Sequence, residues 1–126
     1  MDGFIDTAVV IDIYRGHAPA ISWLRDNPSL LLGMTPIVWM ECVTGASDKS
    51  SQSKITRLLS QFPIVYPTQA DMEWAMRQLQ IFRLSHNVGI LDCLIAAPSY
   101  RLGLPLVTRN LKHFTPILGD LAQQPY

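Results

Sequence analysis

The chain has 126 residues, of which 48% are hydrophobic and 16% are charged, and its ten basic and ten acidic side chains give a formal net charge of zero. This length predicts a single domain over residues 1–126, and the neutral balance argues against a nucleic-acid binder driven by bulk charge, although a local basic patch stays open. No apolar run reaches the roughly 20 residues of a transmembrane helix, and the N-terminus has no signal-peptide pattern, so we expect a cytoplasmic protein with no membrane attachment.

The two cysteines, Cys42 and Cys93, both lie in apolar helical contexts. Such residues behave as small buried hydrophobes more often than as a disulfide or a redox pair. The absence of a CxxC spacing also argues against zinc held by thiolates.

Short apolar runs alternate with longer helical patterns along the chain. The expected strands are 3–6, 29–34, 63–66 and 105–108. The expected helices are 8–15 capped by Thr7, 18–27, one starting at 36, one ending near 62, 68–86, one with Asp92 in its first turn that Gly103 ends, and a short turn over 110–114. Such alternation predicts an α/β fold with parallel strands and helices on both faces.

Two features interrupt this regular pattern. Pro98 lies within the helix that carries Asp92, and proline removes one backbone hydrogen bond and clashes with the carbonyl group four residues earlier, so we expect a kink or an early end. The tail, residues 115–126, is expected to be irregular and to pack across the domain through its apolar side chains.

Four polar residues fall at or just beyond the carboxyl ends of expected strands: Asp6, Glu41, Asp92 and Asn110. In an open parallel sheet, residues at that edge line the ligand crevice. Asp6 could instead simply cap the following helix. Glu41 lies in an apolar helix, where a carboxylate should be protonated, bound to a metal ion or paired, for example with an arginine in a buried salt bridge. Asp12, further along the first helix, is interpreted as solvated or salt-bridged.

Three carboxylates brought close together repel one another unless a cation or a shared proton lies among them. A set of oxygen ligands with no thiolate or imidazole at hand favours Mg²⁺ or Mn²⁺ over zinc. A carboxylate-held divalent ion typically engages phosphates, so the chemistry indicated is phosphodiester hydrolysis. Arg101, Arg109 and Lys112 lie nearby in the sequence and could position a nucleic-acid backbone, or they could be ordinary surface residues.

Four blocks of the sequence carry a resemblance to a known family. They are F-I-D-T-A-V-V-I-D-I-Y-R-G at the start, W-M-E-C-V-T-G in the second block, and L-D-C-L-I-A-A and L-P-L-V-T-R-N-L-K-H-F near the end. In this order and spacing they resemble the PIN-domain ribonucleases, and in particular the VapC-type toxins of bacterial toxin–antitoxin pairs.

The resemblance implies a PIN-like three-layer α/β/α fold with a central parallel sheet of about four strands. It also implies a divalent metal held by acids, cleavage of RNA such as tRNA or rRNA, pairing as a homodimer and silencing by a small VapB-type antitoxin. The family's three acids fall on Asp6, Glu41 and Asp92, and its hydroxyl near the fourth site falls on Thr108. Thr7 and Thr108 are then expected to orient carboxylates.

The sequence also departs from the family pattern. Where many relatives have a fourth acid just past the last strand, this chain offers Asn110 and His113. Asn110 can support the metal or its water but brings no charge, so three acids with one amide suit one Mg²⁺ better than two. The missing acid and Pro98 leave open a catalytically inactive PIN-like module that binds RNA or a protein. A receiver-like signalling domain is disfavoured, since the first strand ends in a single aspartate and Arg109 replaces the lysine that such a domain needs.

Overall fold

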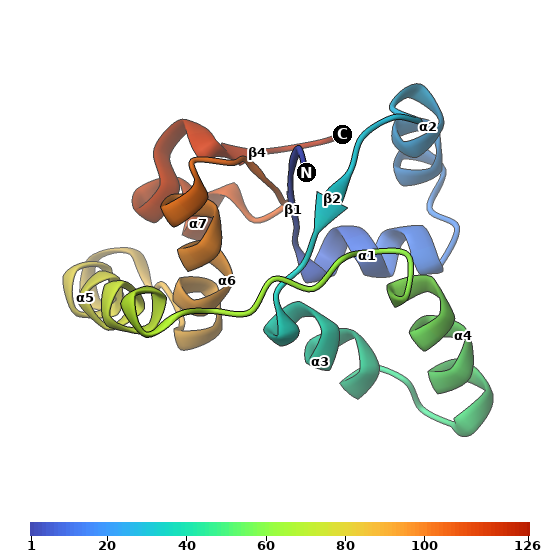
Figure 1. Cartoon of the computed structure of the whole chain (residues 1–126), viewed down its shortest axis with the longest axis horizontal. Coiled ribbons are helices and arrows are strands. Elements are labelled where there is room, and N and C mark those ends of the chain that lie inside the picture. Colours follow the sequence, from blue (N-terminus) through green and yellow to red (C-terminus); the bar gives the residue numbers. More distant parts are fainter.

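A four-stranded parallel sheet forms the centre of the computed structural model, which describes residues 1–126 (Figure 1). The strands are β1 (Gly3–Ile5), β2 (Leu32–Gly33), β3 (Leu106–Val107) and β4 (Ala122–Gln123), and their order in the sheet is β2-β1-β3-β4. Every pairing is parallel, with Phe4 opposite Leu106 and Ile5 opposite Val107. The first strand therefore lies in the middle of the sheet, beside a strand from the end of the chain.

Helices cover both sides of the sheet, which confirms the predicted α/β architecture. The helices are α1 (Thr7–Tyr14), α2 (Ala18–Asp26), α3 (Pro36–Thr44), α4 (Lys49–Leu59), α5 (Gln69–His86), α6 (Ile90–Leu102), α7 (Leu111–Leu118) and the short 3₁₀ helix η1 (Gly119–Leu121). In Figure 1, α1 to α4 lie on one side of the central strands, and α5, α6 and α7 lie on the other. None of these helices combines the length and the apolar character needed to cross a membrane.

The core lies between the strands and these two groups of helices. Phe4, Ile5 and Leu106 on the central strands are almost completely buried, as are Val9 on α1 and Phe114 on α7. Each such side chain contributes roughly 1.5–3 kcal/mol through burial. The predicted buried character of both cysteines is confirmed, and neither forms a disulfide.

The predicted membership of the sheet was partly wrong. Residues 63–66 form only an isolated bridge, in which Ile64 pairs with Met34. Proline at position 63 has no N–H, and the segment bonds to Met34 only through the Pro63 carbonyl and the Val65 N–H. The fourth strand comes instead from the tail, which was expected to be irregular but contains the end of α7, η1 and β4.

Pro98 was expected to cause a kink or an early end of its helix, and the early end was wrong, because α6 continues to Leu102. Proline removes only one backbone bond, and both Pro98 and Ser99 are buried in the packed interior. The contact between α5 and α6 is the most extensive between any two elements, so packing holds α6 together across the missing bond.

Candidate active site

Asp6 lies directly after β1 and is held rigidly. Its backbone is extended, its Oδ1 accepts a hydrogen bond from the Thr7 N–H at 2.8 Å, and its Oδ2 accepts one from the Thr108 hydroxyl at 2.7 Å. Asp6, rather than the predicted Thr7, therefore occupies the N-cap of α1. Helix capping uses only Oδ1 of Asp6, so the alternative that Asp6 simply caps the helix does not account for its second oxygen, which Thr108 holds.

The electrostatic environment of Asp6 is unfavourable for its charge. Burial raises the pKa of this carboxyl above 3.8, its ordinary value, and the hydrogen bonds from Thr108 and Thr7 oppose that shift. The negative charges of Glu41 and Asp92 add to the increase. These two acids therefore lie close enough to Asp6 for their charges to act on it, as expected for residues gathered at one edge of the sheet.

Glu41 is supplied by α3, which begins with Thr35 as the N-cap and Pro36 at its first position. The Thr7 hydroxyl donates to Glu41 Oε1 at 2.7 Å, so Thr7 contacts a carboxylate, and its orienting role stays a prediction. Glu41 forms no salt bridge, so the alternative of a buried pair with an arginine is wrong.

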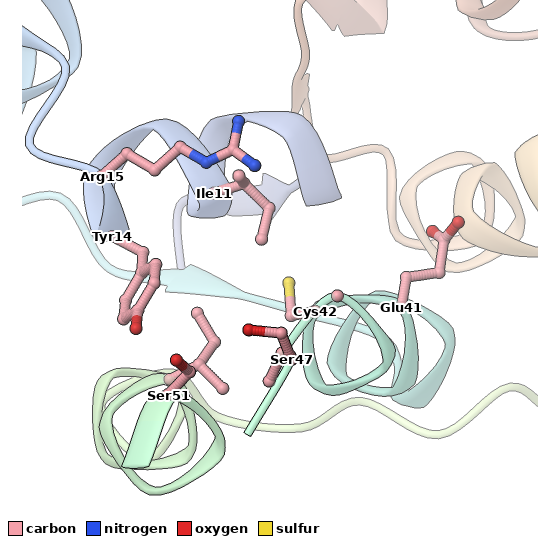
Figure 2. A pocket seen from close by; sticks show the side chains of 10 residues that line it. Ile11, Tyr14, Arg15, Glu41, Cys42, Ser47 and Ser51 are labelled. Carbon is pink, nitrogen blue, oxygen red and sulfur yellow. The ribbon is translucent and has the colours of Figure 1, made fainter. Parts of the chain in front are cut away.

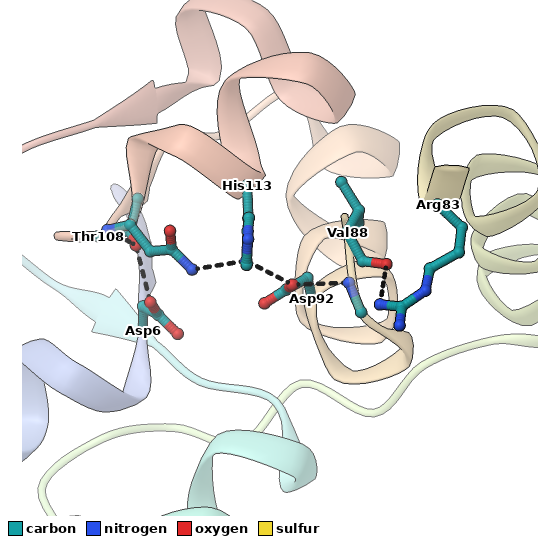
Figure 3. Close-up of polar contacts among 8 residues, drawn as sticks. Asp6, Arg83, Val88, Asp92, Thr108 and His113 are labelled. Atoms are coloured by element: carbon teal, nitrogen blue, oxygen red, sulfur yellow. Dashed lines mark hydrogen bonds and ion pairs between the residues drawn. The ribbon is translucent and has the colours of Figure 1, made fainter. Parts of the chain in front are cut away.

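Asp92 occupies the first turn of α6, as predicted. Its Oδ2 accepts from the Gly89 N–H at 2.9 Å and lies 3.1 Å from His113 Nδ1. Its Oδ1 has no hydrogen-bond partner, which leaves that oxygen free to contact a ligand. Figure 3 shows Asp6, Thr108, His113 and Asp92 along this edge of the molecule.

Thr108 connects the last strand to the site. Its side chain is completely buried, and its hydroxyl donates to Asp6 while accepting from the Asn110 N–H at 3.0 Å. Its own N–H donates to the carbonyl of Gln123 in β4 at 2.9 Å, so the tail helps to fix it. Asn110 stands at the N-cap of α7 but makes no capping bond with its side chain, which instead contacts His113 Nδ1 at 3.1 Å.

Comparison with known proteins identifies the family of the chain. The PIN domain family model matches residues 3–115. The chain belongs to the PIN domain family.

Individual relatives agree with this assignment. The chain is 24% identical to Ribonuclease VapC1 of Rickettsia felis over 123 residues, which cover 91% of this chain and 90% of that protein. Its structure superposes on a toxin–antitoxin complex from Klebsiella pneumoniae with a TM-score of 0.79 and 27% identity, covering 98% of each chain. The fold also matches VapBC2 of Rickettsia felis bound to a promoter DNA fragment, with a TM-score of 0.73, 22% identity, and coverage of 91% and 92%. The resemblance to VapC-type PIN proteins is thereby confirmed.

The donor atoms of this PIN domain fit a hard divalent cation in chemical type. Asp6, Glu41 and Asp92 form no salt bridge with an arginine or lysine, and the unpartnered Asp92 Oδ1 can accept an ion directly. In this structure no three His, Cys, Asp or Glu side chains are arranged to hold one ion. Binding would therefore require the carboxylate side chains to rotate toward a common point.

Two of the three basic residues predicted to contact nucleic acid form ion pairs within the protein, and the third does not. Arg101 pairs with Asp71 at 2.9 Å, and Arg109 pairs with Asp12 at 2.8 Å, which confirms that Asp12 is salt-bridged. Lys112 is exposed and forms no salt bridge. Contact with RNA stays a prediction for all three.

A different arginine lines the cleft at the acids, and sequence reasoning missed it. The cleft has a volume of about 590 Å³ and is lined by Glu41, Leu79, Arg83, Gly89, Ile90, Leu91, Asp92 and His113. Arg83 lies in the last turn of α5, and its Nη1 donates to the Val88 carbonyl at 3.2 Å. Its position depends on how α5 packs against α6. The one local signal that could have found it is a basic residue shortly before the loop that leads to Asp92.

Proposed function

We propose that this PIN domain is a metal-dependent endoribonuclease that hydrolyses RNA phosphodiester bonds and acts as the toxin of a type II toxin–antitoxin pair. The observation that carries the proposal is the gathering of three carboxylates, from the end of β1, from α3 and from α6, none of which pairs with an arginine or lysine. The sequence similarity to Ribonuclease VapC1 supports the reaction class. The structural likeness to the Klebsiella pneumoniae toxin–antitoxin complex supports the biological role.

In this proposal Asp6, Glu41 and Asp92 hold Mg²⁺ or Mn²⁺. A divalent ion bound there supplies an activated water and stabilises charge on the attacked phosphate and the leaving oxygen. The two threonines are positioning residues: Thr108 holds the carboxylate of Asp6, and Thr7 holds that of Glu41.

Substrate positioning is assigned first to Arg83. It is the one arginine or lysine among the residues that line the cleft with Glu41 and Asp92. A guanidinium group at that place can form paired hydrogen bonds with a phosphate of the RNA backbone. Lys112 is free to add a second contact, whereas Arg101 and Arg109 would first have to leave their carboxylate partners. The expected substrates are tRNA or rRNA, encountered in the cytoplasm.

The proposed partners are a VapB-type antitoxin and a second copy of the chain. A groove of about 310 Å³ runs between α1, α3 and α4, lined by Ile11, Tyr14, Arg15, Cys42 and Glu41 among others. Figure 2 shows Glu41 at one end of this groove, with its carboxylate directed away from Tyr14 and Ser51. A segment lying in the groove would thus reach one of the proposed metal ligands. On α5, Met76 is 70% exposed and offers apolar surface for pairing of two copies.

The test is cleavage of a mixed tRNA and rRNA pool by protein freed of any antitoxin, in EDTA, Mg²⁺ and Mn²⁺. The expected result is discrete fragments that require metal and disappear in Asp6→Asn and Asp92→Asn. Asp26→Asn is the matched control, because Asp26 is exposed at the end of α2, and this variant should cleave normally. A folded protein that binds RNA but cleaves none of it in EDTA, Mg²⁺ or Mn²⁺ would refute the proposed nuclease activity. The catalytically inactive PIN-like module would then be the remaining interpretation.

A further inference from the structure

Arg109 is held by two side chains that the proposed reaction does not use. Its Nη1 donates to Asp12 Oδ2 on α1 at 2.8 Å, and the hydroxyl of Tyr126 donates to the same oxygen at 2.6 Å. The guanidinium group of Arg109 also lies over the Tyr126 ring, 5.5 Å from its centre, which is a distance typical of a cation–π contact. Each of the three side chains thus contacts the other two, and we call Asp12, Arg109 and Tyr126 the clamp.

The clamp is anchored to α1 and α2. The ring centre of Tyr126 lies 6.0 Å from that of His17 and 6.4 Å from that of Trp23 on α2. The Asp12 side chain is only 17% exposed, and the hydrogen bond from Tyr126 lowers the pKa of its carboxyl below the ordinary value of 3.8, an effect that Arg109 reinforces. Asp12 is therefore ionised at neutral pH, and the charge of Arg109 is already paired in the free protein.

The clamp lies directly beside residues that build the candidate site. Arg109 stands between Thr108 and Asn110 in the turn that follows β3. The Thr108 hydroxyl holds the carboxylate of Asp6 and accepts the Asn110 N–H. The tail also bonds to Thr108 directly, through the carbonyl in β4 that accepts its N–H at 2.9 Å. The tail therefore holds this turn twice, once through the backbone of β4 and once through the side chain of Arg109.

We propose that Arg109 is a positioning residue rather than an RNA contact, and that the clamp fixes the turn over residues 108–110 in the geometry that holds Asp6. A phosphate could pair with Arg109 Nη1 only in competition with Asp12, which lies 2.8 Å away in the free protein. Small displacements of the groups around a reacting centre lower the rate strongly, so loosening this turn should slow cleavage without weakening RNA binding. This inference rests on the proposed function, because it concerns the same site.

The experiment compares the full chain with its Asp12→Asn, Arg109→Ala and Tyr126→Phe variants. The first readout is hydrogen exchange at single amides, followed by NMR in the protein without RNA, so it does not depend on cleavage. Exchange of the Thr108 and Asn110 N–H groups should accelerate about tenfold or more in each variant, because each change removes or weakens a hydrogen bond to the charged Asp12.

The second readout is cleavage kinetics, measured well below the melting temperature of every variant. We expect kcat to fall about tenfold or more in all three, including Tyr126→Phe, which changes no charge. Arg109→Ala should leave KM and the salt dependence of RNA binding as in the wild type, whereas loss of a phosphate contact would reduce that dependence. Tyr66→Phe is the matched control, because Tyr66 is 71% exposed and its hydroxyl makes no hydrogen bond, and it should change neither readout.

The outcomes separate this inference from the proposed function. Unchanged exchange at Thr108 and Asn110 in Tyr126→Phe would overturn the clamp, and faster exchange with an unchanged kcat would reduce it to a stabilising contact and overturn the positioning role. A higher KM and a weaker salt dependence in Arg109→Ala, with kcat unchanged, would overturn it in favour of an RNA contact. A wild type that cleaves no RNA would overturn the proposed function, and the exchange experiment would still decide whether the clamp fixes the turn.

Discussion

Replacing Thr108 with valine removes one hydroxyl from the centre of the site without changing the shape of the side chain. The substitution deletes the hydrogen bond to the charged Asp6 and leaves the Asn110 N–H without its acceptor. A hydrogen bond to a charged group contributes about 1.5–3 kcal/mol, and a stranded N–H costs about 1 kcal/mol or more, so we expect a loss of about 3 kcal/mol. With an unfolding entropy of about 2.1 cal/mol/K per residue, a chain of 126 residues should then melt about 11 °C lower.

The assay is thermal unfolding followed by circular dichroism at neutral pH, with EDTA present so that metal does not contribute. Thr7→Val is the control, because Thr7 is only half-buried and its hydroxyl makes one hydrogen bond, to Glu41. Its melting temperature should fall by less than about 4 °C, since one partly exposed hydrogen bond contributes about 1 kcal/mol. A Thr108→Val protein that melts no lower than Thr7→Val would refute the argument that Thr108 holds the buried acid.

Three further predictions follow from the structure. Because burial raises the folded-state pKa of Asp6 above its ordinary value of 3.8, the protonated carboxyl stabilises the fold at low pH, and this contribution is lost as pH rises through the folded value. Asp6→Asn should therefore gain in melting temperature relative to the wild type as pH rises above 3.8, and a pH-independent difference would contradict this. Arg83→Ala should weaken binding of an uncleavable RNA and reduce the salt dependence of binding by about one phosphate contact in fluorescence anisotropy, whereas Arg77→Ala, exposed on the same helix, should not. Burial raises the pKa of the Cys42 thiol to about 12 and that of Cys93 to about 11. The native protein should therefore resist a thiol reagent at mildly alkaline pH and react with it once unfolded, and rapid labelling of the native protein would refute this prediction.

The acids could be identified from the sequence because each has a local signature. Asp6 ends an apolar strand, Glu41 interrupts an apolar helix and Asp92 opens another, and such positions require a structural or chemical reason for a charge. The boundaries of α5 were also predictable, since Thr68 and Asp71 form a capping box and Asn87 ends the helix in the left-handed conformation.

The remaining features depend on contacts that no local pattern encodes. Strand β4 has only two residues, and its place in the sheet is set by its pairing with β3. The partner of Arg109 lies 97 residues away in the chain, and that of Arg101 lies 30 residues away. Such ion pairs are fixed by the tertiary arrangement of the helices. The sequence alone therefore could not show whether a basic residue beside a motif is free to bind nucleic acid or is already paired with an acidic side chain.

The pairing of β1 with β3 has a consequence for the biosynthesis of the protein. The ribosome adds Asp6 102 positions before the residue whose hydroxyl holds it. Phe4 and Ile5 likewise lack their central neighbours, Leu106 and Val107, until the ribosome has translated the residues between them. A nascent chain therefore carries the proposed ligands as separate, unassembled segments. The proposed nuclease site therefore cannot assemble until β3 and the residue that follows it have been synthesised.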